Sequence, residues 1–442
     1  FILLFMKSRK NKKKVYVVFA ADILHEGHIN ILSNAAKYGN VIVGLLTDKA
    51  VTSIQKLPQL NYKQREIVLK NIKFVNSIIP QYEIDYTKNL NKIKPDYVLH
   101  GDDWKTGIMS NVRSKVIKQI KKWNGKLIEI PYTKNISSSL FKKRILEAGN
   151  HQLNRVAKLR RLIEAKELVR FLECHNSLTG LIIENLNYIS SKKFEEFDGM
   201  WSSSLTDSIS RGKPDNQSVD LSTRFLGLNE ILDVTTKPVI FDADNGGRTE
   251  HIPYTIRSLE RLGVSAIVIE DKIGLKRNSL FKNQKGVQQD SIRNFSEKIA
   301  AAKEAKKIDD FFIVARIESL ILKKGRKDAL RRAEAYSEAG ADAILIHSKE
   351  KNPKEIFDFS KVFLKSKFHK PLIAVPSTYS IVKESALIKN GIRIVIYANQ
   401  LMRASYPAMF NTAQKILKYK RAKEAEKNII PINNIINLIS KI

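Results

Sequence analysis

The stretch Val239-Ile-Phe-Asp-Ala-Asp-Asn-Gly-Gly247 is a short apolar run that ends in two carboxylates and two glycines. An apolar run of this length, bounded by turn residues, predicts a buried strand over 239–242. Asp242 and Asp244 then stand at and just after its carboxyl end, and the glycines allow a ligand to approach the backbone closely. The stretch predicts a strand-end site, with an ordinary turn at the start of a loop as the simpler alternative.

Similar runs recur along the rest of the chain, and each is followed by a helical or loop segment. The eight predicted strands are 181–183, 199–201, 239–242, 266–270, 312–316, 343–347, 372–375 and 392–396. Eight such units in about 260 residues predict a closed (β/α)₈ barrel. Asp242, Glu270, Arg316 and His347 fall at the ends of four strands, and that rim of such barrels holds the active site.

The first part of the chain also alternates strands and helices. Strands are predicted at 15–20, 41–46, 75–79, 97–100 and 127–130, and helices at 29–38 and 62–72. This pattern predicts an open, Rossmann-like parallel α/β sheet. We expect a disordered basic arm over 1–14, this domain over 15–148, and the barrel with its C-terminal helices over 158–442.

Composition limits the classes of protein to which the chain can belong. It has 442 residues, 43% of them hydrophobic and 28% charged, which predicts globular domains. The single cysteine excludes an internal disulfide framework, and no apolar run approaches the ~20 residues of a membrane span. A cytoplasmic protein with no membrane association is therefore expected.

The net charge of +32 suggests either anionic partners or lysines scattered over solvated surfaces. Because no RNA-binding signature is present, we expect no nucleic acid partner.

The segment after the first predicted strand carries a candidate phosphate site. His25 and His28 are three residues apart, so they share one face of the first turn of a helix. Free N–H groups and the helix dipole at such an N-terminus favour phosphate, and imidazoles can stabilise charge on a phosphoryl group. Two polar capping histidines are the simpler alternative. Ser137, Ser138 and Ser139 precede another helical stretch and suit further phosphates or an ordinary N-cap.

This domain resembles the cytidylyltransferase family that activates glycerol 3-phosphate, phosphocholine and phosphoethanolamine. The resemblance rests on His25-Glu-Gly-His28, Asp22, Ile136-Ser-Ser-Ser139, the stretch 61–79 and Gly101-Asp-Asp-Trp104. It implies CTP as the nucleotide and a nucleotide site made of Asp22, His25, His28, Lys56, Asp102, Ser137, Ser138 and Ser139. His25 and His28 would stabilise the transition state. The sequence Phe19-Ala-Ala-Asp22 departs from the family's Gly-x-Phe-Asp because it lacks the glycine.

Oxygen ligands gather at the predicted barrel rim. Asp242, Asp244 and Glu270 on neighbouring strand ends make a hard site that suits partly hydrated Mg²⁺. Arg316 offers a guanidinium fork for phosphate or carboxylate, and His347 can donate to a phosphoryl oxygen. The polar loop that leaves Glu270 could close over the site and exclude water.

The loop Glu270-Asp-Lys-Ile-Gly-Leu-Lys-Arg-Asn-Ser279 carries the sharpest resemblance in the chain. It matches Glu-Asp-Lys-x-Gly-x-Lys-x-Asn-Ser, the hallmark of phosphoenolpyruvate mutases in the isocitrate lyase superfamily, and the resemblance extends over about 159–417. It implies Mg²⁺-dependent conversion of phosphoenolpyruvate to phosphonopyruvate. The implied substrate-binding residues are Trp201, Ser203, Ser204, Leu205, Lys276 and Ser279. The implied catalytic residues are Asn278, Arg316, His347 and Asp244, and the implied metal residues are Asp242, Asp244 and Glu270.

Several alternatives remain for the barrel. A phosphonopyruvate hydrolase would admit water, which the complete loop motif disfavours. A carbon–carbon lyase of the isocitrate type would place a cysteine in the loop, whereas Cys174 lies far upstream. A basic nucleic-acid-binding protein would leave the strand-end carboxylates unexplained.

Two further expectations concern the whole protein. The pairing of domains suggests a bifunctional enzyme of phosphonate biosynthesis, in which CTP activates a phosphonate such as 2-aminoethylphosphonate or 2-hydroxyethylphosphonate. The resemblance also implies a homodimer or homotetramer that exchanges its C-terminal helices.

Overall fold

The computed structural model describes residues 13–105, 109–131, 152–190, 194–281 and 283–439. These residues form two compact units. The first holds the described residues up to Val169 together with Asn185–Asp198, and the second holds Arg170–Glu184 and the described residues from Gly199 onward. Most of the predicted basic arm and the residues 137–139 lie outside the described ranges.

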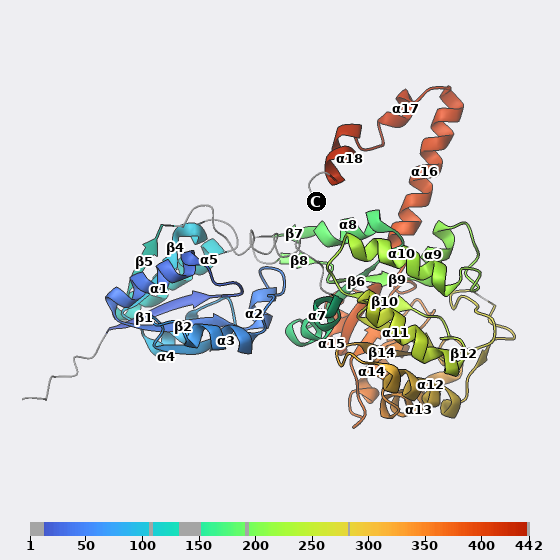
Figure 1. Cartoon of the computed structure of the whole chain (residues 1–442), viewed down its shortest axis with the longest axis horizontal. Coiled ribbons are helices and arrows are strands. Elements are labelled where there is room, and N and C mark those ends of the chain that lie inside the picture. Colours follow the sequence, from blue (N-terminus) through green and yellow to red (C-terminus); the bar gives the residue numbers. More distant parts are fainter. Residues whose placement is uncertain (1–12, 106–108, 132–151, 191–193, 282, 440–442) are drawn as a thin grey trace, which may run out of the picture. The chain divides into compact units, whose positions relative to one another are not determined.

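The first unit is built on a five-stranded parallel sheet in the order β3-β2-β1-β4-β5 (Figure 1). Its strands are β1 (Lys14–Phe19), β2 (Asn40–Leu46), β3 (Ser77–Gln81), β4 (Tyr97–Gly101) and β5 (Lys126–Ile130). Side chains of β1 alternate between two buried clusters, Tyr16 and Val18 in one and Val15 and Val17 in the other. Such alternation places apolar packing on both faces of a parallel sheet.

Helices and a hairpin complete the first unit. The helices are α1 (Glu26–Tyr38), α2 (Asp48–Thr52), α3 (Tyr62–Lys70), α4 (Thr87–Ile93), η1 (Asp102–Lys105), α5 (Ser110–Ile120), η3 (Lys121–Trp123) and α7 (Gln152–Ala165). The hairpin pairs β7 (Asn187–Ile189) with β8 (Phe194–Glu196) in antiparallel fashion. The predicted Rossmann-like sheet is confirmed.

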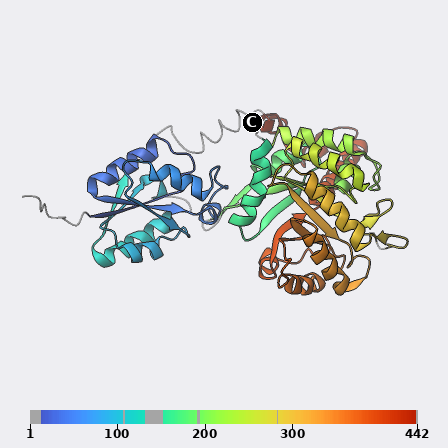
Figure 2. The same ribbon diagram turned by 60° about the horizontal axis from the view of Figure 1, so that its bottom comes forward.

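The second unit is a closed barrel of eight parallel strands in the order β10-β11-β14-β15-β16-β17-β6-β9. Its strands are β6 (Val169–Glu173), β9 (Gly199–Ser202), β10 (Val239–Asp242), β11 (Ala266–Glu270), β14 (Phe312–Ile317), β15 (Ala343–Ile346), β16 (Leu372–Ala374) and β17 (Ile392–Tyr397). Helices surround these strands (Figure 2). The predicted (β/α)₈ barrel is therefore confirmed.

The helices of the second unit follow its strands in sequence. They are α8 (Ser177–Asn185), α9 (Ser204–Ser210), α10 (Leu221–Asp233), η4 (Thr249–His251), α11 (Ile252–Leu262), α12 (Ile292–Ala305), α13 (Gly325–Glu338), α14 (Lys354–Phe363), α15 (Glu384–Lys389), α16 (Gln400–Tyr419), α17 (Lys423–Glu426) and α18 (Ile432–Ile439). Among the described residues, no helix is both long and apolar enough to cross a bilayer.

One predicted strand is wrong. Residues 181–183 lie inside helix α8, and the first barrel strand is β6, twelve residues earlier at Val169. The side chain of Asn176 accepts a hydrogen bond from the Thr179 backbone N–H at 2.9 Å, which favours a helix start here. A short apolar run does not by itself distinguish a strand from a buried helical segment. Here the cap formed by Asn176 favours the helix.

Candidate functional site

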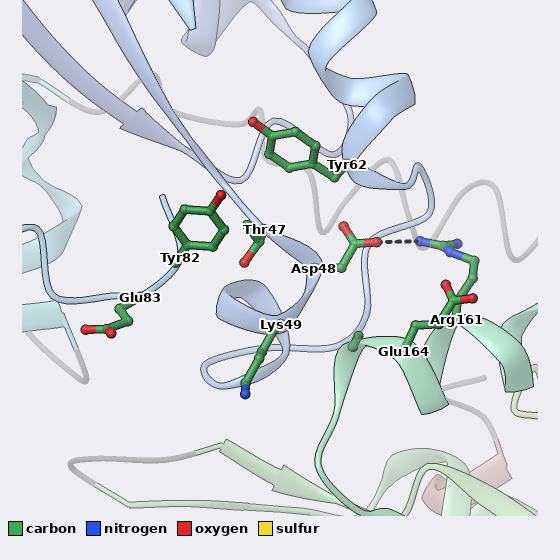
Figure 3. A pocket seen from close by; sticks show the side chains of 9 residues that line it. Thr47, Asp48, Lys49, Tyr62, Tyr82, Glu83, Arg161 and Glu164 are labelled. Carbon is green, nitrogen blue, oxygen red and sulfur yellow. Dashed lines mark ion pairs between the residues drawn. The ribbon is translucent and has the colours of Figure 1, made fainter. Parts of the chain in front are cut away.

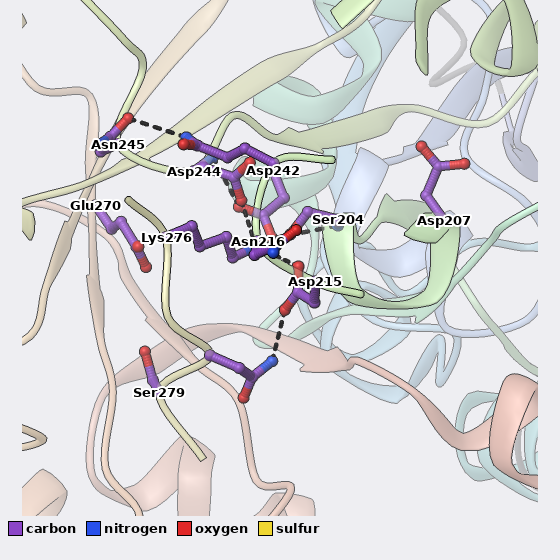
Figure 4. Close-up of polar contacts among 12 residues, drawn as sticks. Ser204, Asp207, Asp215, Asn216, Asp242, Asp244, Asn245, Glu270, Lys276 and Ser279 are labelled. Carbon is purple, nitrogen blue, oxygen red and sulfur yellow. Dashed lines mark hydrogen bonds and ion pairs between the residues drawn. The ribbon is translucent and has the colours of Figure 1, made fainter. Parts of the chain in front are cut away.

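Three carboxylates lie buried at the ends of two neighbouring barrel strands. Asp242 ends β10, Asp244 follows it with a positive φ of 54°, and Glu270 ends β11. Their exposed fractions are 5%, 7% and 2%. Asp242 accepts a hydrogen bond from the Ser204 hydroxyl at 2.8 Å. The strand pairing of β10 with β11 therefore brings together the oxygen ligands that the sequence predicted (Figure 4).

Burial and neighbouring charge act in opposite directions on these carboxyl groups. Burial works to raise the pKa of Asp242, but the charges of Lys276, Arg316 and Arg224 hold that pKa at about 2. At Glu270 burial prevails over the cations nearby and raises the pKa to about 7. Asp242 is thus a fixed anion at neutral pH, whereas Glu270 can exchange a proton with its surroundings.

The loop after β11 returns over these carboxylates. Lys276 forms ion pairs with Asp215, at 2.8 Å, and with Asp244, and it also donates to the Ser204 hydroxyl. Asn278 donates its amide to Asp215 at 2.7 Å. Figure 4 shows Lys276 reaching in among Asp215, Asp244 and Ser204. We call residues 272–289 the lid, since its ends pair as strands β12 (Lys272–Ile273) and β13 (Gln288–Gln289).

Arg316 and His347 face the same lid from neighbouring strands. The Arg316 guanidinium donates to Glu318 at 2.7 Å, to the Ser279 hydroxyl at 2.8 Å, and lies 3.0 Å from His347 Nδ1. A guanidinium has only donors, so Nδ1 accepts and the ring proton is assigned to Nε2. Burial lowers the pKa of His347, which favours this neutral ring.

The predicted pyruvyl-binding residues lie beside this cluster. Trp201 belongs to β9 and is 3% exposed, and Ser203 and Ser204 at the start of α9 are each 4% exposed. Leu205 is partly buried in the first turn of the same helix. The structure therefore groups the predicted substrate-binding residues with the strand-end carboxylates.

Sequence reasoning missed the groups that orient this cluster. Glu318 is fully buried and accepts hydrogen bonds from Arg316 and, at 2.6 Å, from Ser279. Arg224, 4% exposed, donates to the Asp242 carbonyl at 2.6 Å and to Asp207 at 3.1 Å. A signal existed for Glu318, which lies two residues after Arg316 and so on the same face of an extended chain. No local signal identified Arg224, which lies inside a helix.

The donor atoms at the barrel rim are of the kind that binds a divalent metal. In the described ranges, no three His, Cys, Asp or Glu side chains are arranged to hold a metal ion directly. Asp242, Asp244 and Glu270 nevertheless offer only oxygen ligands on adjacent strand ends. Mg²⁺ commonly keeps several waters and uses one or two carboxylates. The donor set therefore fits Mg²⁺ held largely through water.

The first unit carries the second candidate site, at the end of β1. His25 is the N-cap of α1 and accepts from the Gly27 backbone N–H at 3.2 Å, and its ring lies 4.1 Å from the ring of His28. Burial lowers the pKa of His28 to about 4, so its ring is neutral at pH 7. His28 Nδ1 is buried and has no hydrogen-bond partner among the described residues, as expected of a group that meets a ligand.

The other predicted nucleotide residues differ in their burial and in the elements that carry them. Asp22 is 2% exposed and accepts from the Leu60 backbone N–H at 3.0 Å. Lys56 lies in an exposed loop, and Asp102 opens η1. Phe19, which stands where the resembled family has glycine, packs edge-on against His28 with ring centroids 5.1 Å apart. Ser137, Ser138 and Ser139 lie outside the described residues.

Comparisons with known proteins place both units in families. Residues 159–417 match the family model of phosphoenolpyruvate phosphomutase, and residues 20–144 match the cytidylyltransferase-like model. The chain is 34% identical over 286 residues to the phosphoenolpyruvate phosphomutase of Tetrahymena pyriformis, which covers 64% of this chain and 91% of that protein.

Two solved structures are similar to the second unit. The phosphoenolpyruvate phosphomutase of Streptomyces platensis subsp. rosaceus superposes with a TM-score of 0.59 at 34% identity, covering 65% of this chain and 95% of that one. A phosphonopyruvate hydrolase in complex with oxalate and Mg²⁺ superposes with a TM-score of 0.58 at 32% identity, with the same coverage.

The buried position of Glu318 generates a stability prediction. Replacing Glu318 with Ala removes one of the two buried carboxylates that Arg316 and Lys272 share, the other being Glu270, which should lower the free energy of unfolding by about 3–5 kcal/mol. Urea unfolding followed by circular dichroism measures the change. As a control, Glu297→Ala removes a carboxylate that is 59% exposed and should cost less than about 1 kcal/mol. Equal midpoints for the two variants would contradict the role assigned to Glu318.

Proposed function

The chain belongs to the phosphoenolpyruvate phosphomutase family, and on that premise we propose that its barrel converts phosphoenolpyruvate to phosphonopyruvate while its first unit transfers a cytidylyl group to a phosphonate. The observation that carries the first half is the convergence of Asn278, Arg316 and His347 with three strand-end carboxylates under one lid. Phosphoryl transfer needs positioning and charge stabilisation more than covalent catalysis, and this site offers both.

The isomerisation moves one group within one molecule. The bond from phosphorus to the enol oxygen breaks, phosphorus bonds to carbon 3, and the enol oxygen becomes the keto oxygen of phosphonopyruvate. No proton is gained or lost. Arg316 and His347 donate to phosphoryl oxygens, and Asn278 does the same once its amide turns from Asp215. The backbone N–H groups of Ser204 and Leu205 hold the carboxylate and enolate oxygens, beside Trp201 and Ser203.

Mg²⁺ is the proposed cofactor. A related phosphonopyruvate hydrolase has been solved with oxalate and Mg²⁺, and Asp242, Asp244 and Glu270 supply oxygen ligands here. When bound, the ion stabilises the negative charge on the enolate oxygens. Lys276 and Ser279 then hold the lid over the substrate from the opposite side.

The lid favours the mutase over the hydrolase, which remains the alternative. Lys276 and Asn278 of the lid both contact Asp215, and these contacts support a closed site of the kind that excludes water. A hydrolase would need a water in line with phosphorus. A ³¹P NMR measurement distinguishes the two activities by their products.

We expect the protein with Mg²⁺ to convert the ³¹P signal of phosphonopyruvate to that of phosphoenolpyruvate. Asn278→Ala should slow this conversion about 100-fold or more, since it removes a donor to the transferring group. Asn283→Ala, an exposed asparagine of the same lid, is the control and should retain full rate. Accumulation of inorganic phosphate would identify a hydrolase, and no reaction by folded, Mg²⁺-loaded protein would reject both.

The first unit is proposed to activate a phosphonate with CTP. A phosphonate oxygen attacks the α-phosphorus of CTP, a new phosphorus–oxygen bond forms, the bond to the β-phosphate breaks, and pyrophosphate leaves. His25 and the neutral ring of His28 donate to the α-phosphoryl oxygens beside the N-terminus of α1. Asp22, Lys56, Asp102 and Ser137 to Ser139 complete the proposed nucleotide site.

His28→Ala should lower CTP-dependent pyrophosphate release with aminoethylphosphonate or hydroxyethylphosphonate about 100-fold or more. The ³¹P mutase rate of the same variant should not change, which shows that the effect is confined to the first unit. His369→Ala replaces an exposed histidine of the second unit and should leave both rates intact. An unchanged release rate for His28→Ala would remove this histidine from the mechanism.

We further propose that the C-terminal helices join copies of this chain. Helix α16 exposes 53–69% of the side chains of Tyr406, Met409, Phe410 and Leu417. Among the described residues of this helix, only Met402 is buried. Exposed apolar patches on such helices mark interaction sites. Light scattering should give a mass of at least twice 50.4 kDa, and Phe410→Glu with Leu417→Glu should give a monomer. A monomeric wild type would contradict this assembly.

A further inference from the structure

A hollow lies within the first unit, on the other side of β1 from β4. Its volume is about 510 Å³, and its walls come from the segments that follow two strands and from the helices α2, α3 and α7 (Figure 3). Thr47, Asp48 and Lys49 follow β2, and Tyr82 and Glu83 follow β3. Tyr62 opens α3, and α7 contributes Arg161, Glu164 and Ala165. This volume lies in the range of small-molecule sites.

The position of the hollow suits the second substrate of a nucleotidyl transfer. In an open parallel sheet, ligands bind outside the carboxyl ends of the strands, and the nucleotide takes the point where the strand order reverses. Here that point lies between β1 and β4, beside His25 and His28. The hollow opens at the same edge of the sheet but over β2 and β3. An acceptor bound there approaches the α-phosphate from the side away from β4.

The wall next to β1 is rigidly held. Arg65 is fully buried, and its guanidinium donates to the Leu46 carbonyl at 2.9 Å, to Asp48 at 2.5 Å and to the Ala20 carbonyl. One side chain thus fastens the ends of β1 and β2 to the carboxylate that lines the hollow. The charge of Asp48 is thereby neutralised, so it is not the group that recognises a ligand.

Helix α7 supplies groups that remain available. Arg161 donates to the carbonyls of Gln59, at 2.8 Å, and Pro58, at 2.6 Å, and lies 3.9 Å from Asp48, an ion pair drawn in Figure 3, but its buried Nε has no acceptor among the described residues. Glu164, one turn further along the helix, accepts no hydrogen bond from the described chain. Figure 3 shows Glu164 beside Arg161, with the rings of Tyr62 and Tyr82 across the hollow.

Both signs of charge therefore meet in one hollow. Arg161 offers donors to an anion, and so does Lys49, whose present partner is an exposed Glu167 at 3.1 Å, whereas Glu164 and the rings of Tyr62 and Tyr82 attract a cation. A purely anionic acceptor would meet uncompensated carboxylate here, but a zwitterion satisfies both sets. Helix α7 lies outside residues 20–144, and its Arg161 and Glu164 fall within residues 159–417, which match the phosphoenolpyruvate phosphomutase family, although they pack in the first unit.

We propose that this hollow binds the acceptor of the cytidylyl transfer, that α7 completes it, and that the acceptor is a zwitterionic aminoalkylphosphonate. The phosphonate faces Arg161 and Lys49, and the ammonium faces Glu164 and the two tyrosines. This inference rests on the proposed nucleotidyl transfer and names its acceptor class. Glu164 is the specificity-determining residue, because it distinguishes an ammonium from a hydroxyl.

The test compares full-length wild type with Glu164→Gln in CTP-dependent pyrophosphate release. The KM for 2-aminoethylphosphonate should rise about tenfold or more in the variant, because a charge-assisted contact is lost. The KM for CTP and the mutase rate should not change. The preference for 2-aminoethylphosphonate over 2-hydroxyethylphosphonate should fall by the same factor. Glu66→Gln is the matched control, since it removes a carboxylate of this unit that does not line the hollow.

The outcomes separate this inference from the function on which it rests. If wild type releases pyrophosphate and Glu164→Gln leaves the KM for 2-aminoethylphosphonate unchanged, the acceptor site is wrong and the transferase stands. If wild type shows no release with any phosphonate, the proposed transferase activity is wrong. Calorimetric titration with 2-aminoethylphosphonate alone then shows whether the hollow binds this compound. Binding weakened by Glu164→Gln supports the site, and absence of binding overturns it.

Discussion

The mouth of the barrel is organised by one constraint, that each buried carboxylate must be matched by a buried cation. Asp244, Glu270 and Glu318 are at most 7% exposed, and an uncompensated charge at that depth is costly. The matching cations are Lys272 and Lys276 from the lid and Arg316 from β14. The groups that bind the lid to the barrel are therefore the groups of the candidate site itself, so lid position and site charge are set together.

A second layer of polar contacts supports the first. Asp271, next to Glu270, is fully buried and accepts hydrogen bonds from Tyr336 at 2.9 Å and from the Glu318 backbone N–H at 2.9 Å. Arg332 lies 3.2 Å from the same carboxylate. These contacts fix the ends of β11 and β14 relative to each other, so Glu270 and Arg316 keep their orientation. Precise placement of this kind is what a reaction that relies on positioning requires.

In the first unit, too, a buried cation is paired with a carboxylate at the carboxyl ends of the strands. A single buried guanidinium, that of Arg65, joins the carboxyl ends of β1 and β2 through backbone carbonyls and Asp48. The histidine pair and the hollow lie on either side of this joint. Both proposed sites of the chain thus depend on parallel strands, which bring their carboxyl ends to one edge, and on arginines that fix the loops leaving that edge.

The sequence by itself determined both fold classes, most strand positions, and the residues at the strand ends. Asp242, Glu270, Arg316 and His347 were predictable because they end apolar runs, and closure of a parallel barrel brings such ends together whatever lies between them. The pair His25 and His28 was predictable because its spacing is local. Only one short run, 181–183, was assigned to the wrong element, since its apolar pattern fits a strand or a buried helix equally well.

Only the tertiary structure decided which charges meet. Arg224, Arg65 and Arg161 lie within helices that have no chemical signature of their own, and their partners are distant in sequence. Asp215 contacts Lys276 and Asn278, which belong to the lid and lie about 60 residues further along the chain. Contacts of this kind depend on loop paths and side-chain directions, which hydrophobic periodicity does not encode, because periodicity reports burial and not the identity of the neighbour.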